Sequence, residues 1–165
     1  MRDNDFFRFG FVRNPLDRLL SCYTQKIVHY GRERAMPLEF WRYGRTFHPD
    51  MSFADFVHAV AGIPDRFSDI HFRSQYTFFY HRGRPMTDFV GRYERLDEDW
   101  EQLRRRFGFD ALPHLNRSTH RDYRDAYSPE LARVAVRRYR QDIELFGYQE
   151  AVAAALRKPP ECDCK

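Results

Sequence analysis

The sequence predicts an α/β domain in which short strands are each followed by a helix. In residues 6–27 the apolar residues change from a period of two to the spacing of a helix, and residues 87–107 repeat that change. Two further segments, 52–62 and 128–146, have the apolar face and the N-cap of a helix. With 165 residues, 42% of them hydrophobic and 32% charged, the chain suits one domain with a real core.

The first strand and the first helix meet at Asn14. Phenylalanines at alternate positions of Phe7–Phe11 indicate a strand, which we expect to end at Arg13. Asn14 is a favoured N-cap, and Pro15 suits the first helical position because its missing N–H needs no partner there. A helix is therefore expected to start at Pro15.

The polar face of this helix indicates an anion site. Asn14, Arg18 and Ser21 recur at helical spacing. A helix N-terminus at the carboxyl end of a strand offers free N–H donors and a positive dipole. Arg13 adds a guanidinium group and Ser21 a hydroxyl, both suited to phosphate oxygens. From these residues alone, a surface arginine beside an ordinary solvated serine is the open alternative.

The stretch Phe11–Tyr23, with the sequence FVRNPLDRLLSCY, resembles the 3′-phosphate-binding motif of sulfotransferases that use 3′-phosphoadenosine 5′-phosphosulfate (PAPS), in particular the carbohydrate sulfotransferases. The resemblance implies that Arg13 and Ser21 hold the 3′-phosphate. It also implies a P-loop-NTPase-like fold, a three-layer arrangement of a parallel sheet flanked by helices, over residues 1–148. Residues 149–165 are expected to form a peripheral helix and a disordered tail.

The segment Asp69–Tyr76 resembles the His-aromatic-x-x-Gln segment of the same enzymes. The resemblance implies that His71 orients the acceptor hydroxyl or takes its proton, which suits a side chain that titrates near neutral pH. A structural or substrate-positioning histidine is an equally weighted alternative. In related enzymes the base can also come from the segment that precedes the 3′-phosphate motif, which we expect this chain to lack.

The segment Leu112–Thr119 resembles the family's loop that closes over the nucleotide. The resemblance assigns three of its residues to nucleotide binding: Arg117, Ser118 and Thr119. A polar surface loop is the alternative. Residues 30–51 lack sustained periodicity and predict a long irregular connection with one short helical turn. In the family the corresponding region helps to form the acceptor side of the cleft.

One part of the family's machinery has no counterpart in the sequence. Sulfotransferases bind the 5′-phosphosulfate with an earlier strand, a phosphate loop and a helix, and no Gly-rich turn bearing a lysine occurs here. We therefore expect the C-terminal part of a sulfotransferase domain that lacks this first unit. Such a chain would be a fragment, a mis-started reading frame or a degenerate copy.

The function implied by the resemblance is transfer of a sulfuryl group from PAPS to a hydroxyl of a carbohydrate or glycan acceptor, with PAPS as co-substrate and no metal. The alternative is a catalytically inactive remnant that binds a nucleotide or a polyanion. A kinase is disfavoured because the phosphate loop and Mg²⁺ ligands are missing. The net charge of +4 and the pI of about 9.1 favour an anionic ligand, and no nucleic acid is expected as a partner.

The cellular location is also an expectation. No apolar run is long enough for a transmembrane helix or a secretory signal. The three cysteines, Cys22, Cys162 and Cys164, lack the spacing of a disulfide framework. We expect a cytoplasmic, bacterial-type protein, with membrane association as in Golgi relatives as the alternative. The acceptor, the sulfated position and the oligomeric state stay open.

Overall fold

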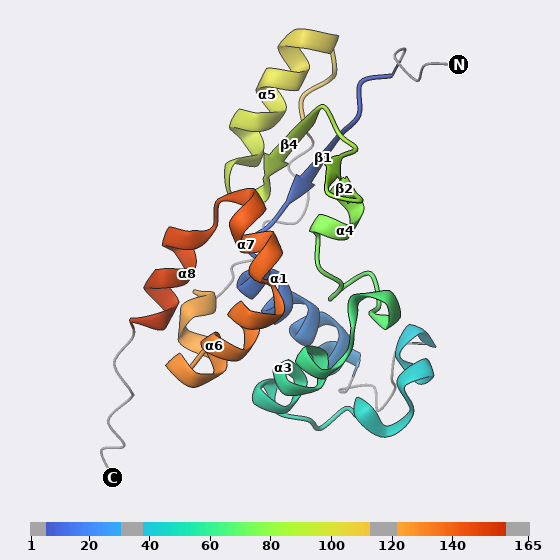
Figure 1. Ribbon diagram of the computed structural model, residues 1–165, viewed down its shortest axis with the longest axis vertical. Coiled ribbons are helices and arrows are strands. Elements are labelled where there is room, and N and C mark those ends of the chain that lie inside the picture. The colour runs from blue at the N-terminus through green and yellow to red at the C-terminus, as the bar shows by residue number, and fades with distance from the viewer. Residues whose placement is uncertain (1–5, 31–37, 113–121, 158–165) are drawn as a thin grey trace.

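A parallel pair of strands lies at the centre of the computed structural model, which describes residues 6–30, 38–112 and 122–157 (Figure 1). Strands β1 (Phe9–Val12) and β4 (Phe89–Arg92) pair in parallel, with Phe9 opposite Phe89. Strands β2 (Tyr80–His81) and β3 (Arg84–Pro85) form a separate antiparallel hairpin. The described part of the chain is therefore an α/β structure with a small parallel sheet, as the sequence predicts.

Helical segments make up most of the rest. The longer α-helices are α1 (Pro15–Tyr23), α3 (Phe53–Gly62), α5 (Leu96–Phe107), α6 (Pro129–Arg138), α7 (Arg140–Phe146) and α8 (Gln149–Leu156). The shorter segments are the π-helix η1 (Thr24–His29), the 3₁₀ helices η2 (Leu38–Thr46), η3 (Asp65–Phe67), η4 (Tyr93–Arg95) and η5 (Tyr123–Ala126), and the single turn α4 (Tyr76–Phe79).

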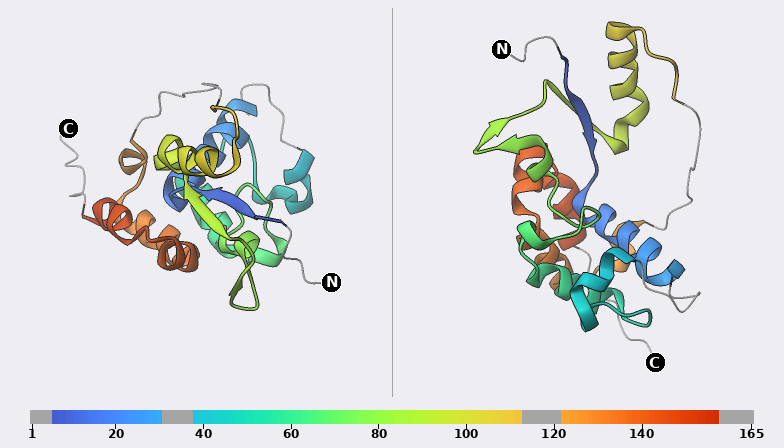
Figure 2. Two further views of the ribbon diagram at one scale, coloured as in Figure 1. Left: turned by 90° about the horizontal axis from the view of Figure 1, so that it is seen from above. Right: turned by 90° about the vertical axis from the view of Figure 1, so that its right-hand side faces the viewer.

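Helices lie on both faces of the parallel sheet (Figure 2). Phe9 and Phe11 project toward α5, where their ring centroids lie 6.2 and 6.4 Å from that of Trp100. On the other face, a Cβ atom at Gly10 would lie 2.7 Å from the Phe79 ring of α4, so this close approach requires a glycine. The layering is compatible with the P-loop-NTPase-like fold; the larger sheet and the missing first unit stay predictions.

The main core lies where α1, α3 and α6 pack together beyond the end of the sheet (Figure 1). Each of these helices contributes fully buried residues to it: Leu16, Leu19, Phe56, Val57, Val60, Ala132 and Ala135. Helix α8 packs on α6, with Val152 and Ala155 buried. The domain boundary at residue 148 stays a prediction, and the tail 158–165 lies outside the described residues.

The 128–146 helix differs from the prediction because it is broken at Tyr139, whose backbone has φ −107° and ψ 23°. The Tyr139 ring is buried, and its hydroxyl donates to the Phe72 carbonyl at 2.7 Å. Helix α7 starts after this break, and its Asp142 contacts the turn that follows Phe72.

The described part of the connection 30–51 contains more helix than predicted, since residues 38–46 are helical with a kink at Gly44, where φ is 57°. Phe40 and Phe47 from this region are buried and pack against Phe72. The hairpin β2–β3 was not predicted. It turns at Arg82 and Gly83, which have φ of 49° and 75°.

In the described part of the chain, no helix is long and apolar enough to cross a membrane.

Candidate functional site

The junction between β1 and α1 is fixed by Asn14, which is only 3% exposed. Its Oδ1 accepts the Leu16 backbone N–H at 3.0 Å, as expected of an N-cap. Its own backbone N–H donates to the Glu94 carboxylate at 2.6 Å, and its Nδ2 donates to the Tyr123 hydroxyl at 3.0 Å. The start of α1 is thus held by groups that are distant in sequence, although the β1 ladder ends at Val12, one residue before the predicted end.

Arg13 and Ser21 lie together at this junction, as the resemblance to the 3′-phosphate-binding motif implies. Arg13 Nη1 donates to Ser21 Oγ at 3.3 Å, and Arg13 Nε donates to Asp17 Oδ2 at 2.7 Å. The guanidinium carbon lies 4.9 Å from the centre of the Tyr93 ring. The Arg13 side chain remains 18% exposed. A cation fixed on three sides and open to solvent is suited to a phosphate group.

Asp17 makes the site less positive than the sequence suggests. Its carboxylate occupies one edge of the Arg13 guanidinium, so an anion would share this cation with Asp17. The Nη2 group of Arg13 has no hydrogen-bond partner among the described residues. An anion can therefore approach from the Nη2 and Ser21 side while Asp17 keeps the Nε edge.

His71 lies on a turn beside α1 and pairs with Asp69. The distance from His71 Nδ1 to Asp69 Oδ1 is 2.6 Å, and the same oxygen accepts the His71 backbone N–H at 3.0 Å. The His71 side chain is 36% exposed, whereas Asp69 is 9% exposed. Because Nδ1 faces the carboxylate, Nε2 is the nitrogen left to accept a proton.

Arg18 fastens this turn to α1. Its Nη1 and Nη2 donate to the carbonyls of Arg73 and Ile70 at 2.7 and 2.5 Å. Arg18 therefore has a structural role, although it shares the polar helix face with Ser21.

Other charged groups near the turn are paired. Lys26, 8% exposed, donates to Glu39 at 2.6 Å, and this bond is the main reason why the pKa of Glu39 lies below its ordinary value. Burial raises the pKa of the Cys22 thiol to about 12. The raised pKa favours the protonated thiol, which is a poor nucleophile.

Residues 1–149 match the family model for the sulfotransferase family. The chain belongs to this family. It is 25% identical over 174 residues to carbohydrate sulfotransferase 10 of Xenopus laevis, covering 90% of this chain and 49% of that protein. It is 27% identical over 169 residues to carbohydrate sulfotransferase 10 of Homo sapiens, with 88% and 48% covered. It is 30% identical over 166 residues to carbohydrate sulfotransferase 14 of Mus musculus, with 87% and 42% covered.

This sulfotransferase-family chain thus spans about half the length of the curated relatives it matches. No solved structure matches it.

Some of the predicted site lies outside the described residues, namely Arg117, Ser118 and Thr119. Within the described ranges, no group of three or more histidine, cysteine and acidic side chains could hold a metal ion. Sequence reasoning also missed two residues that surround Arg13. The i+4 spacing of Asp17 signals its ion pair, but no local pattern brings Tyr93 to the guanidinium.

Proposed function

We propose that this chain carries the 3′-phosphate-binding and acceptor-activating part of a sulfotransferase that moves a sulfuryl group from PAPS to a hydroxyl of a carbohydrate. The main support is the Arg13–Ser21 pair at the start of α1, in a chain that matches the sulfotransferase family over residues 1–149. In the reaction, the acceptor oxygen bonds to sulfur while the bond from sulfur to the bridging phosphate oxygen breaks. The products are the sulfate ester and 3′,5′-adenosine diphosphate.

In this proposal the strand-end residues bind rather than react. Arg13 offers its Nη groups and Ser21 its hydroxyl to the 3′-phosphate, while the N-terminus of α1 adds a positive dipole. Arg117, Ser118 and Thr119 are assigned further nucleotide contacts. None of the described residues is assigned to the 5′-phosphosulfate.

His71 is assigned the acceptor proton. As the acceptor oxygen attacks sulfur, its proton passes to Nε2 of His71, and Asp69 stabilises the imidazolium that forms. The exposure of His71 supports this role, because a side chain that is 36% exposed can be reached by an acceptor.

The test is sulfuryl transfer from ³⁵S-labelled PAPS to a panel of desulfated glycans by a protein that joins this chain to a 5′-phosphosulfate-binding unit. Transfer is measured by label in the glycan and by release of 3′,5′-adenosine diphosphate. We expect the His71→Ala variant to lose transfer by about a hundredfold or more while its affinity for 3′,5′-adenosine diphosphate is unchanged. His58→Ala is the matched control, since His58 is an exposed histidine on α3.

Equal transfer by wild type and His71→Ala would remove His71 from the mechanism. Binding of the nucleotide without transfer to any glycan would favour the alternative function, an inactive nucleotide-binding remnant.

A further inference from the structure

The buried side chain of Gln75 forms two hydrogen bonds with the backbone of Arg13. The Arg13 N–H donates to Gln75 Oε1 at 2.9 Å, and Gln75 Nε2 donates to the Arg13 carbonyl at 2.8 Å. Arg13 lies one residue beyond the last rung of the β1–β4 ladder. The Gln75 amide therefore does for Arg13 what a neighbouring strand does for the residues of β1.

Gln75 is itself held by the buried carboxylate of Asp142 on α7. Asp142 Oδ2 accepts the Gln75 backbone N–H at 2.8 Å, and Oδ1 accepts that of Tyr76 at 2.7 Å. Asp142 is fully buried, and burial raises its pKa, although the two backbone N–H donors oppose that shift. The Asp142 carboxylate thus fixes the position and orientation of the backbone at Gln75.

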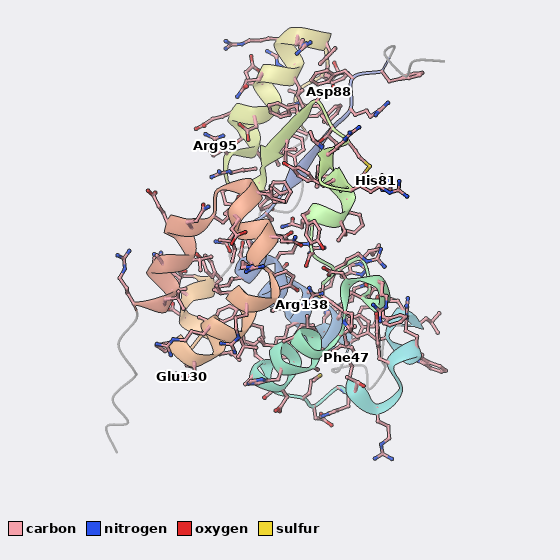
Figure 3. All side chains as sticks on the ribbon, viewed as in Figure 1. Phe47, His81, Asp88, Arg95, Glu130 and Arg138 are labelled. Carbon is pink, nitrogen blue, oxygen red and sulfur yellow. The ribbon has the colours of Figure 1, made fainter. Side chains whose placement is uncertain are left out.

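A second contact fixes the same turn from α6. Arg138, labelled in Figure 3, donates from Nη1 to Ser74 Oγ at 2.9 Å and from Nη2 to Asp65 at 2.6 Å. Ser74 and Gln75 are both buried. Gln75, which holds Arg13, is therefore itself held in place by side chains of α6 and α7.

The position of Gln75 gives this support a functional meaning. Gln75 directs both ends of its amide to the one residue that carries the proposed 3′-phosphate contact, and it follows His71 by four residues on the same turn. Binding constellations need their groups held to within a fraction of an ångström, which backbone clamps provide.

We propose that Gln75 is a positioning residue for the 3′-phosphate site, acting through the backbone of Arg13 and anchored by Asp142. The inference rests on the proposed function. Its consequence is that the 3′-phosphate site and the His71 turn share one support.

The experiment measures the selectivity ratio, the Kd of 5′-AMP divided by the Kd of 3′,5′-adenosine diphosphate, by calorimetry on the full chain. Gln75→Met keeps the length of the side chain and removes both hydrogen bonds, and we expect it to lower the ratio by about tenfold. In an Arg13→Ala background the same change is expected to leave the ratio within about twofold, because Gln75 acts through Arg13. Val57→Ala, a core truncation on α3, controls for lost stability and should leave the ratio unchanged.

The outcomes separate this inference from the proposed function. A wild-type ratio near one contradicts the proposed 3′-phosphate site itself. A high wild-type ratio that Gln75→Met does not lower overturns the positioning role alone, as does an equal loss in the Arg13→Ala background. Should Gln75→Met fail to fold by circular dichroism, Gln75→Glu replaces it. That variant keeps an acceptor for the Arg13 N–H, and an intermediate ratio is expected, whereas an unchanged ratio would overturn the inference.

Discussion

Two neighbouring regions of this molecule are stabilised in different ways. The strand-end site, which comprises Arg13, Asn14, Asp17 and Ser21, occupies nine consecutive positions, and much of its geometry follows from one strand and one helix. The histidine turn, residues 69–75, accepts hydrogen bonds from Arg18 on α1 and Arg138 on α6, and it donates one to Asp142 on α7.

The difference lies in how far each region depends on distant elements. The spacing of Asp17 and Ser21 is set by one helix, although Gln75, Glu94 and Tyr123 also hold the backbone and the cap of the strand-end site. A turn that is held by three helices depends on the whole fold, and it loses its shape when any of these supports is removed. The two regions are joined by the two hydrogen bonds between the Gln75 side chain and the Arg13 backbone.

The largest expected effect concerns the strand-end site. Arg13→Ala removes the charged donor, and we expect it to weaken binding of 3′,5′-adenosine diphosphate by about 1.5–3 kcal/mol in calorimetry. Arg105→Ala removes the same charge from an exposed position on α5 and should leave the affinity unchanged. An equal loss of affinity in both variants would show that only the net charge of the protein matters, and not the position of Arg13.

The histidine turn is tested by Asp142→Asn, which replaces one acceptor oxygen with an NH₂ group facing a buried backbone N–H. We expect the free energy of unfolding in urea to fall by about 1–3 kcal/mol. The control is Glu150→Gln, which makes the same change of charge at an exposed position of α8. If the stability of Asp142→Asn matched that of the wild type, the turn would not depend on α7.

A smaller effect is expected from Ser21→Ala, which removes one neutral hydroxyl while Arg13 stays in place. The affinity for 3′,5′-adenosine diphosphate should fall by about 0.5–1.5 kcal/mol, and that for 5′-AMP should not change. A parallel loss for both nucleotides in the same titrations would show that Ser21 does not face the 3′-phosphate.

The smallest effect concerns Asp65, which is half-buried beside Arg138. Burial raises its pKa, but the Arg138 hydrogen bond, the Ser74 N–H and the Arg138 charge together hold the pKa below its ordinary value. The stability from Asp65 is therefore present above the unfolded-state pKa and is lost as the pH falls through the folded-state pKa.

The unfolding free energies of wild type and Asp65→Asn should accordingly differ at neutral pH and converge in acid, as pH-dependent urea titrations would measure. A difference that stays constant down to a pH of about 2 would show that this carboxylate contributes through packing and not through its charge.

The strand-end site could be predicted because its signals are consecutive. Asn14 followed by Pro15 marks the start of α1, and the spacing of Arg13 and Ser21 brings them within 3.3 Å. The roles of Gln75 and Asp142 could not be predicted, because their contacts join residues 62 to 67 positions apart. The break at Tyr139 is similar, because it accompanies a buried hydrogen bond to the Phe72 carbonyl that no local pattern indicates.

The fold was also predictable in part. Periodicity predicted the two strands of the parallel sheet and most of the helices. The β2–β3 hairpin was not predicted, because its turn places a positive φ on Arg82, a residue type that does not indicate one. Phe40, Tyr43 and Phe47 have the i, i+3, i+7 spacing of a helix, but Gly44 interrupts this short segment, and the pattern does not indicate that Phe40 and Phe47 pack in the core with Phe72.

The most direct test of the account is an NMR titration that follows the Nε–Hε signal of Arg13 and the backbone amide signals of α1 in the full chain. We predict that 3′,5′-adenosine diphosphate shifts the Arg13 signal and the amides from Leu16 to Ser21, and that 5′-AMP leaves the Arg13 signal in place. Equal shifts with both nucleotides, or shifts confined to other parts of the molecule, would contradict a 3′-phosphate site at the start of α1.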